Sequence, residues 1–141
     1  MKKLLFVVDP LDQFKVYKDT TFSIMREAQW RGYLIAACLP QDIQWKSGGF
    51  VMATVQQISL TGSQPGWYRV HNTMRMALKD FDAVLMRKDP PFNAEYIYAT
   101  HLLEQAERED GNVVNRPRAL RDHPEKLAIM EFPELVPPTL V

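Results

Sequence analysis

The sequence has only one cysteine and no recognisable set of metal-binding side chains. Cys38 cannot form an internal disulfide, and it stands in the apolar run 34–39, where a small buried thiol is expected. A nucleophilic cysteine would need polar or positively charged surroundings, which this run lacks. The three histidines, His71, His101 and His123, share no metal-ligand spacing, so the sequence does not indicate a zinc site.

An excess of charge and a long hydrophobic run are also missing. The 17 Lys and Arg residues equal the 17 Asp and Glu residues, so the formal net charge is zero. Because phosphate contacts supply much of the affinity of nucleic-acid binders, which usually show a basic excess, we expect no nucleic-acid partner. No stretch approaches the roughly 20 apolar residues of a membrane span, and no cleavage site follows the short apolar run near Met1. We therefore expect a cytoplasmic protein without a membrane partner.

The glycine-rich motifs of common nucleotide sites do not occur. The sequence contains neither the Gly-x-Gly-x-x-Gly pattern of dinucleotide-binding folds nor a P-loop. What is present is the balance of an ordinary globular protein, with 46% hydrophobic and 24% charged residues. A length of 141 residues is enough for one domain with a hydrophobic core.

Short apolar runs predict the strands of an α/β fold. Runs without alternation, typical of buried parallel strands, cover residues 4–8, 33–39 and 83–86, with a brief strand at 113–114. Glycines between two β-rich runs predict an antiparallel hairpin of residues 43–46 and 50–60, followed by a short strand at 67–70. We expect a mainly parallel sheet flanked by helices, with this antiparallel hairpin as an insertion.

Capping residues and helical spacing predict three helices. Asp19 is a candidate N-cap for a helix that ends at Gly32, and Asn93 is a candidate N-cap for a second helix. Residues expected to line the buried face of the second helix are Tyr96, Ala99, Leu103 and Ala106. An Asp-x-x-Glu capping pattern beginning at Asp122 predicts a third helix that continues through Phe132.

The turn that follows the run 83–86 contains the main candidate binding residues. Ligands of open parallel sheets bind beyond the carboxyl ends of the strands, where Arg87, Lys88 and Asp89 stand. The two cations could hold a substrate carboxylate, and Arg87 could do so through two parallel hydrogen bonds. The alternative is structural: Asp89 caps a turn and pairs with Arg87.

A second candidate lies at the end of the first strand and the start of its helix. Asp9, Lys18 and Asp19 are expected at the same edge of the sheet as Arg87, and a helix N-terminus there favours anions. The alternative is that Asp19 is a plain N-cap. From the residues alone, the prediction is an α/β domain that binds a small ligand.

Several segments together resemble the N-terminal part of bacterial glutathione synthetases. The most specific are Met-Arg-Lys-Asp-Pro-Pro-Phe at residues 86–92 and the Asn-x-Pro, Leu-Arg-Asp and Glu-Lys elements within residues 115–126. Further segments in matching order are residues 8–10, 18–22, 27–33 and 96–100. The likeness spans nearly the whole chain and is weakest at about residues 40–80.

The resemblance implies an ATP-grasp ligase that joins γ-glutamylcysteine and glycine to form glutathione. In that family Mg-ATP (or the Mn form) phosphorylates the cysteinyl carboxylate, and the glycine amine attacks the acyl phosphate. A Rossmann-like pre-ATP-grasp domain is expected at residues 1–122, with the truncated start of the ATP-grasp region at 123–141. Because the chain stops on an apolar residue, we expect the intact enzyme to continue beyond it. The resemblance further implies that this part alone is inactive and that the enzyme is a homo-oligomer.

The resemblance also implies roles for particular residues. Lys126 matches a lysine that contacts the ATP phosphates. The residues expected on the peptide-substrate side are Arg87, Asp89, Asp19 and Lys18. Metal ligands, the remaining ATP contacts and any catalytic residue are expected beyond Val141. Two alternatives stay open: another carboxylate–amine ligase with the same domain order, and a non-catalytic binding module.

Overall fold

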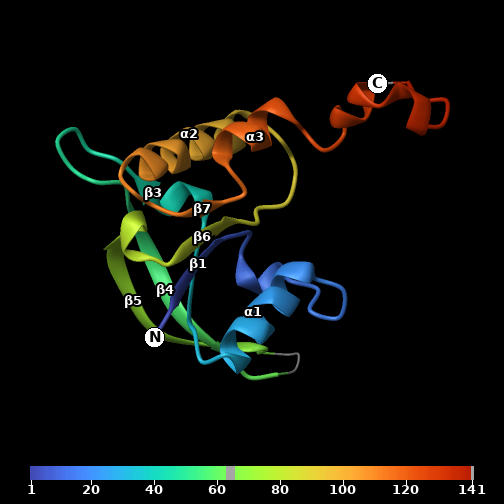
Figure 1. Ribbon diagram of the computed structural model, residues 1–141. Coiled ribbons are helices and arrows are strands. Elements are labelled where there is room, and N and C mark those ends of the chain that lie inside the picture. Colours follow the sequence, from blue (N-terminus) through green and yellow to red (C-terminus); the bar gives the residue numbers. More distant parts are fainter. Residues whose placement is uncertain (63–65, 141) are drawn as a thin grey trace.

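The computed structural model describes residues 1–62 and 66–140 as a sheet with helices on both faces (Figure 1). The parallel strands are β1 (Lys3–Val7), β2 (Leu34–Cys38), β6 (Ala83–Met86) and β7 (Val113–Val114). The antiparallel strands are β3 (Ile43–Gln44), β4 (Met52–Leu60) and β5 (Tyr68–Ala77). The strand order is β3-β4-β2-β1-β6-β7, and β5 pairs with β4. The predicted fold class is confirmed, including the hairpin of β3 and β4.

Three α-helices surround this sheet. They are α1 (Thr20–Trp30), α2 (Ala94–Arg108) and the short α3 (Pro117–Asp122), which lies beside α2 in Figure 1. Short 3₁₀ turns cover Leu11–Gln13, Pro40–Asp42, Leu78–Asp80, Ala128–Glu131 and Pro133–Leu135. Within residues 1–62 and 66–140, no helix combines the length and the apolar character needed to cross a membrane.

Side-chain oxygens begin the two long helices, as their sequences predict. The Asp19 carboxylate accepts the amide hydrogen of Phe22 at 3.0 Å, and the Asn93 side chain accepts that of Tyr96 at 3.0 Å. Each bond satisfies a backbone donor that has no partner within the helix. Both predicted N-caps are confirmed, and Gly32, with φ of 73°, follows the end of α1 in the left-handed conformation.

The hydrophobic core has two halves, one on each face of the sheet. Successive residues of a strand point to opposite faces, so Leu5 and Val7 pack on the α2 side while Phe6 and Val8 pack on the α1 side. All four are at least 99% buried. Burial on both faces explains why β1 reads as a continuous apolar run rather than an alternating one.

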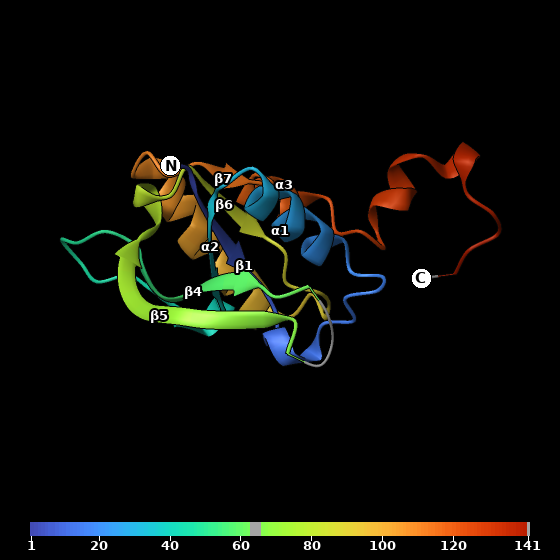
Figure 2. The same cartoon turned by 90° about the horizontal axis from the view of Figure 1, so that it is seen from below.

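The prediction of a third helix from Asp122 through Phe132 is wrong. Helix α3 ends at Asp122, where the predicted helix was to begin, and the Asp122 carboxylate is bound by Arg118 of the same helix at 3.2 Å. Pro124 disfavours the helical conformation in the residue before it, and His123 accordingly has φ of −124° and ψ of 67°. Residues 123–135 instead form turns that project away from the sheet, as Figure 2 also shows.

Strand β5 is much longer than the predicted strand at residues 67–70. It runs to Ala77 and pairs with β4 along its length, with a bulge between Gln57 and Ile58. Its central residues are polar and exposed because β5 lies at the edge of the sheet (Figure 2). Since few of its side chains are buried, the sequence of β5 has no hydrophobic pattern from which this strand could be predicted.

The core beneath α2 provides a test of the fold. Leu103 is fully buried, so Leu103→Ala should lower the free energy of unfolding by about 2–5 kcal/mol through lost contacts and the cavity left behind. Tyr98 lies on the same helix but is 67% exposed, so Tyr98→Ala should cost less than about 1 kcal/mol. Urea denaturation followed by circular dichroism measures both, and equal losses would contradict the described packing.

Candidate functional site

The two central strands of the sheet define where a ligand site is expected. The chain passes from β1 to β2 on one side and from β6 to β7 on the other, so the strand order reverses between β1 and β6. Open α/β sheets bind ligands beyond the carboxyl ends of the strands at such a point. Asp9 follows β1 and Arg87 follows β6, which places both at this edge.

The Asp9 carboxylate joins the two strand ends. One oxygen, Oδ1, lies 2.8 Å from Lys88 Nζ, and the other, Oδ2, accepts the amide hydrogen of Asp89 at 2.9 Å. Lys88 Nζ also donates to the Asp89 carbonyl at 2.7 Å. The structural alternative foreseen for this turn, a pair between Arg87 and Asp89, does not form; Lys88 is paired with Asp9 instead.

Arg87 and Lys88 differ in their side-chain partners: Lys88 is paired with a carboxylate, whereas the described partner of the Arg87 side chain is a neutral hydroxyl. Its amide donates to the Val7 carbonyl at 2.8 Å, and its Nε donates to the Thr21 hydroxyl in the first turn of α1 at 3.0 Å. Among the described residues, no carboxylate lies within ion-pair distance of this half-buried guanidinium. Burial raises the pKa of the nearby Tyr96 hydroxyl, and the positive charge of Arg87 opposes that rise. Arg87 is therefore available to an anion.

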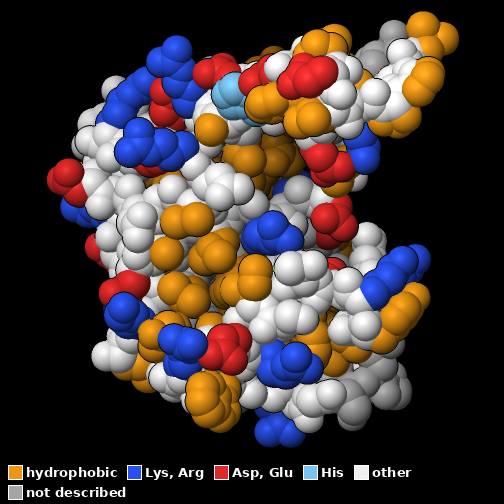
Figure 3. Space-filling view, turned by 45° about the vertical axis from the view of Figure 1, so that its right-hand side comes forward, with side chains coloured by type: hydrophobic (Ala, Val, Ile, Leu, Met, Phe, Trp, Pro, Cys, Tyr) orange, Lys and Arg blue, Asp and Glu red, His pale blue; other side chains and the backbone are white. Residues whose placement is uncertain are grey.

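A cavity of about 570 Å³ opens beside this turn. Figure 3 shows the molecule deeply hollowed below its projecting C-terminal segment, with hydrophobic side chains inside and charges of both signs at the rim. Its walls come from the turn after β6, the start of α2 and the segment that follows α3. The lining residues are Met86, Arg87, Lys88, Asp89, Pro90, Phe92, Tyr96, Asn115, Leu120, His123, Pro124, Glu125, Lys126 and Leu127. This volume suits a small ligand.

The structure brings three of the five candidate site residues to this cavity. Arg87 and Asp89, from the turn after β6, line it together with Lys126, from the segment that follows α3. Lys126 is highly exposed, and its Nζ lies 2.7 Å from Glu125 Oε1, which raises the pKa of the lysine. Lys18 and Asp19 do not line the cavity; Lys18 is exposed, and the Asp19 carboxylate caps α1.

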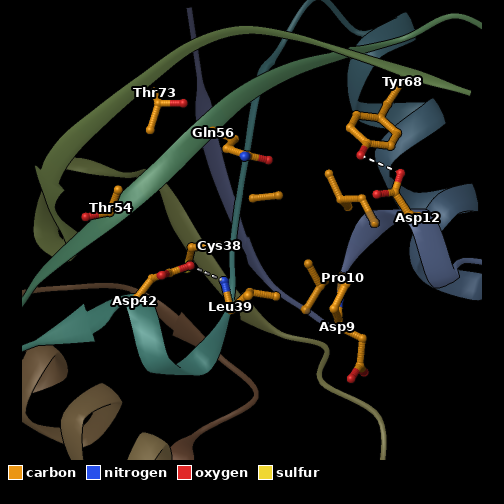
Figure 4. A pocket seen from close by; sticks show the side chains of 13 residues that line it. Asp9, Pro10, Asp12, Cys38, Leu39, Asp42, Thr54, Gln56, Tyr68 and Thr73 are labelled. Carbon is orange, nitrogen blue, oxygen red and sulfur yellow. Dashed lines mark hydrogen bonds between the residues drawn. The ribbon is translucent and has the colours of Figure 1, made fainter. Parts of the chain in front are cut away.

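A smaller cavity of about 370 Å³ lies on the other side of Asp9 (Figure 4). Thr54, Gln56 and Thr73 of the antiparallel strands line one side, and the segment after β1 lines the other. The Tyr68 hydroxyl donates to Asp12 Oδ1 at 2.8 Å, and partial burial together with this bond raises the pKa of Tyr68. Cys38 touches this cavity only from within the core, and its burial raises the pKa of its thiol. The burial of this thiol, predicted from the sequence, is confirmed.

Helix α3 is fixed to α2 by a half-buried arginine. Arg121 donates to the hydroxyl of the fully buried Thr100 at 3.1 Å and pairs with Glu104. The hydrogen bond from Arg121 holds the pKa of Glu104 below its ordinary value. This contact sets the direction in which the chain leaves α3 toward His123 and Lys126, and so it positions one wall of the larger cavity.

The sequence predicts no binding role for several residues that line the larger cavity. Tyr96 was expected only to line the buried face of α2, and Asn115 and His123 stood in or beside the family-like segment without an assigned function. The proximity of Asp9 and Lys88 could be predicted from the sequence, because each stands two residues after a central parallel strand. The contact of Thr21 with Arg87 could not be predicted from the sequence, since it depends on how α1 packs on the sheet.

The described residues do not form a metal site. Within residues 1–62 and 66–140, no group of three or more His, Cys, Asp or Glu side chains comes together in a way that could hold a metal ion.

The sheet order and the cavity at its switch point define an open α/β domain of the kind that binds a small ligand. A family model described as "Prokaryotic glutathione synthetase, N-terminal domain" matches residues 2–121. The chain belongs to this family, which confirms the resemblance inferred from its residues.

Curated relatives are similar over the whole chain. A glutathione synthetase of Ralstonia nicotianae is 50% identical over 139 residues, which are 99% of this chain and 43% of the relative. A glutathione synthetase of Nitrosomonas europaea is 47% identical over 142 residues, and one of Vibrio cholerae is 45% identical over 141 residues; each match covers 44% of the relative. The chain spans less than half of the length of the curated relatives it matches.

The contact between His123 and Glu131, in the wall of the larger cavity, should depend on pH. His123 Nδ1 lies 2.6 Å from Glu131 Oε1, and this bond raises the pKa of His123. The contact therefore contributes fully below the ordinary histidine pKa of about 6.5 and is lost as the pH rises through the raised value. An NMR titration of the imidazole should show this raised pKa, and Glu131→Gln should return it toward the ordinary value. Glu134→Gln is the matched control, and an equal effect of both changes would contradict the assignment.

Proposed function

We propose that this domain holds the peptide substrate of a glutathione-forming ligase, with Arg87 binding a carboxylate of γ-glutamylcysteine. The observation that supports this most is the state of the cations around the larger cavity. Lys88 and Lys126 are each paired with a carboxylate, whereas the Arg87 guanidinium has only the neutral Thr21 hydroxyl as a hydrogen-bond partner among the described residues. A guanidinium can bind a carboxylate through two hydrogen bonds, which gives orientation as well as affinity.

The other lining groups suit the rest of such a peptide. The exposed carboxylate of Asp89 is available to an ammonium group, because its backbone rather than its side chain is engaged by Asp9. Phe92 and Tyr96, whose ring centroids are 5.0 Å apart, provide an apolar surface beside it. A γ-glutamyl dipeptide presents both charges and an apolar CH₂ chain between them. Lys18 and Asp19 remain proposed for the peptide-substrate side, although they do not line this cavity.

The proposed reaction of the whole protein is the joining of γ-glutamylcysteine and glycine with consumption of ATP. The cysteinyl carboxylate takes the terminal phosphoryl group of ATP, and the glycine amine then displaces phosphate and loses a proton, leaving glutathione and ADP. Support comes from family membership and from the similarity to proteins named glutathione synthetase. With ATP as co-substrate, we propose the cytoplasm as the location.

This chain would contribute binding and orientation rather than the chemical step. Lys126 is the residue proposed to contact the ATP phosphates, after its pairing with Glu125 is exchanged for the nucleotide. A magnesium or manganese ion would neutralise phosphate charge when bound, and its ligands would come from residues outside those described. Arg87 would orient the substrate, and the apolar lining would limit the access of water.

Binding to the 141-residue chain tests the role of Arg87. Isothermal titration calorimetry should show that Arg87→Gln weakens γ-glutamylcysteine binding by about 10- to 100-fold, as expected for the loss of a charge-assisted hydrogen bond. Arg75→Gln removes an exposed arginine of β5 far from the cavity lining and should leave the affinity unchanged. Equal weakening by both changes, or no effect of Arg87→Gln, would contradict the proposed contact.

The proposed reaction is tested with a longer protein of the length of the relatives. Incubation with ATP, γ-glutamylcysteine and glycine should release ADP and form glutathione, both measured by chromatography. Replacing glycine by other amino acids should abolish ADP release if glycine is the acceptor. Activity with a different acceptor alone would favour another carboxylate–amine ligase, and no ADP release with any acceptor would reject the ligase.

A further inference from the structure

Two buried threonines each bind an arginine. Among the described residues, Thr21 and Thr100 are the polar residues that are buried. The Thr100 hydroxyl donates to the Ile97 carbonyl at 2.6 Å and accepts a hydrogen bond from Arg121, the contact that fixes α3. The Thr21 hydroxyl accepts a hydrogen bond from Arg87 Nε at 3.0 Å. Thr21 does not line the larger cavity itself, so any effect that it has on a ligand there must pass through Arg87.

The position of Thr21 is fixed by the helix that contains it. Thr21 lies in the first turn of α1, where the Asp19 carboxylate caps the amide of Phe22. The Phe22 ring packs edge-on against Trp67, with the ring centroids 5.3 Å apart. A threonine is branched at Cβ, so its side chain has few rotamers in a helix. The Thr21 hydroxyl is therefore a fixed acceptor beside the turn that follows β6.

The contact leaves one edge of the Arg87 guanidinium available. A guanidinium has five N–H donors, one on Nε and two on each Nη, and a carboxylate can bind either the Nε edge or the two terminal nitrogens. Thr21 occupies Nε, and within residues 1–62 and 66–140 neither Nη atom forms a hydrogen bond or an ion pair. The two terminal nitrogens are therefore the donors that remain for a ligand in the larger cavity, which Arg87 lines.

We propose that Thr21 is a positioning residue, which directs the terminal nitrogens of Arg87 toward a carboxylate of the peptide substrate. This inference rests on the proposed role of Arg87 and adds to it the edge of the guanidinium that binds. Binding through both terminal nitrogens makes two parallel hydrogen bonds and sets the plane of the carboxylate. Without the Thr21 acceptor, the half-buried Arg87 side chain gains rotamers that binding must then freeze, so the affinity falls.

A purely structural role for Thr21 makes the opposite prediction for two substitutions. Thr21→Val keeps the branched shape and removes the acceptor, whereas Thr21→Ser keeps the acceptor and removes a buried methyl group. If Thr21 only fills space in the core, the serine variant is the more damaged one. If Thr21 positions Arg87, the valine variant binds the peptide less well.

Calorimetric titration of the 141-residue chain with γ-glutamylcysteine separates the two roles. Thr21→Val should weaken binding about 3- to 10-fold, the effect of one lost hydrogen bond, and Thr21→Ser should stay within about twofold of the unchanged chain. Thr20→Val is the matched control, because Thr20 is the exposed neighbour of Thr21, and it should leave the affinity unchanged. Weakening by the serine variant equal to or greater than that by the valine variant would overturn the proposal.

A double substitution tests whether Thr21 acts through Arg87. In the Arg87→Gln background, Thr21→Val should have no further effect on the affinity, because the side chain that Thr21 positions is gone. An equal loss in both backgrounds would contradict this inference and leave the role of Arg87 intact. If Arg87→Gln itself does not weaken binding, the proposed role of Arg87 fails, and this inference fails with it.

NMR tests the contact in the absence of the peptide. The hydrogen on Arg87 Nε should exchange slowly with solvent in the unchanged chain and in Thr21→Ser, and about tenfold faster in Thr21→Val, because exchange requires the hydrogen bond to open. The signal is assigned by its absence from Arg87→Gln. Thr21→Ala also removes the acceptor and gives a second variant for both measurements, and circular dichroism melting shows that each variant is folded. Equal exchange rates in the serine and valine variants would show that Thr21 does not hold Arg87.

Discussion

The carboxylate of Asp9 holds the ends of the two central strands together. Its two oxygens bind Lys88 Nζ and the Asp89 amide, so one side chain after β1 fixes two consecutive residues after β6. Bonds of this kind are short and directional because one or both partners are charged. Only about a quarter of each paired side chain is exposed, which limits screening by water and salt. This contact therefore fixes the turn after β6 relative to the end of β1.

The contact also determines which cation remains available. Since Lys88 is neutralised by Asp9, the positive charge that faces the larger cavity belongs to Arg87, held against α1 by Thr21. Asp9 itself lines the smaller cavity, together with Asp12, Asp42 and Gln56. The two cavities therefore differ in character: the larger has an available cation, and the charged side chains of the smaller are all acidic. This difference is why an anionic peptide is assigned to the larger cavity.

The parts of the fold that burial determines could be predicted from the sequence. The runs that became β1, β2 and β6, and the caps Asp19 and Asn93, depend on local patterns that the folded chain preserves. Strand β5 could not be predicted, because its polar residues face solvent and its pairing with β4 is a non-local contact. The wrong helix after Asp122 shows how a capping pattern can fail when Pro124 constrains the residue before it. At the site, Arg87 and Lys126 come to the same cavity because Arg121 fixes α3 to α2. This contact joins residues far apart in the chain, so no local sequence pattern could predict it.

We propose that Arg87, which has no carboxylate partner among the described residues, is the anchor for an anionic peptide. A crystal structure of this chain with γ-glutamylcysteine bound tests it most directly. The account predicts a carboxylate of the peptide within hydrogen-bond distance of the Arg87 guanidinium, with the Asp9–Lys88 pair intact. A peptide seated instead in the smaller cavity, between Asp12 and Gln56, would contradict it.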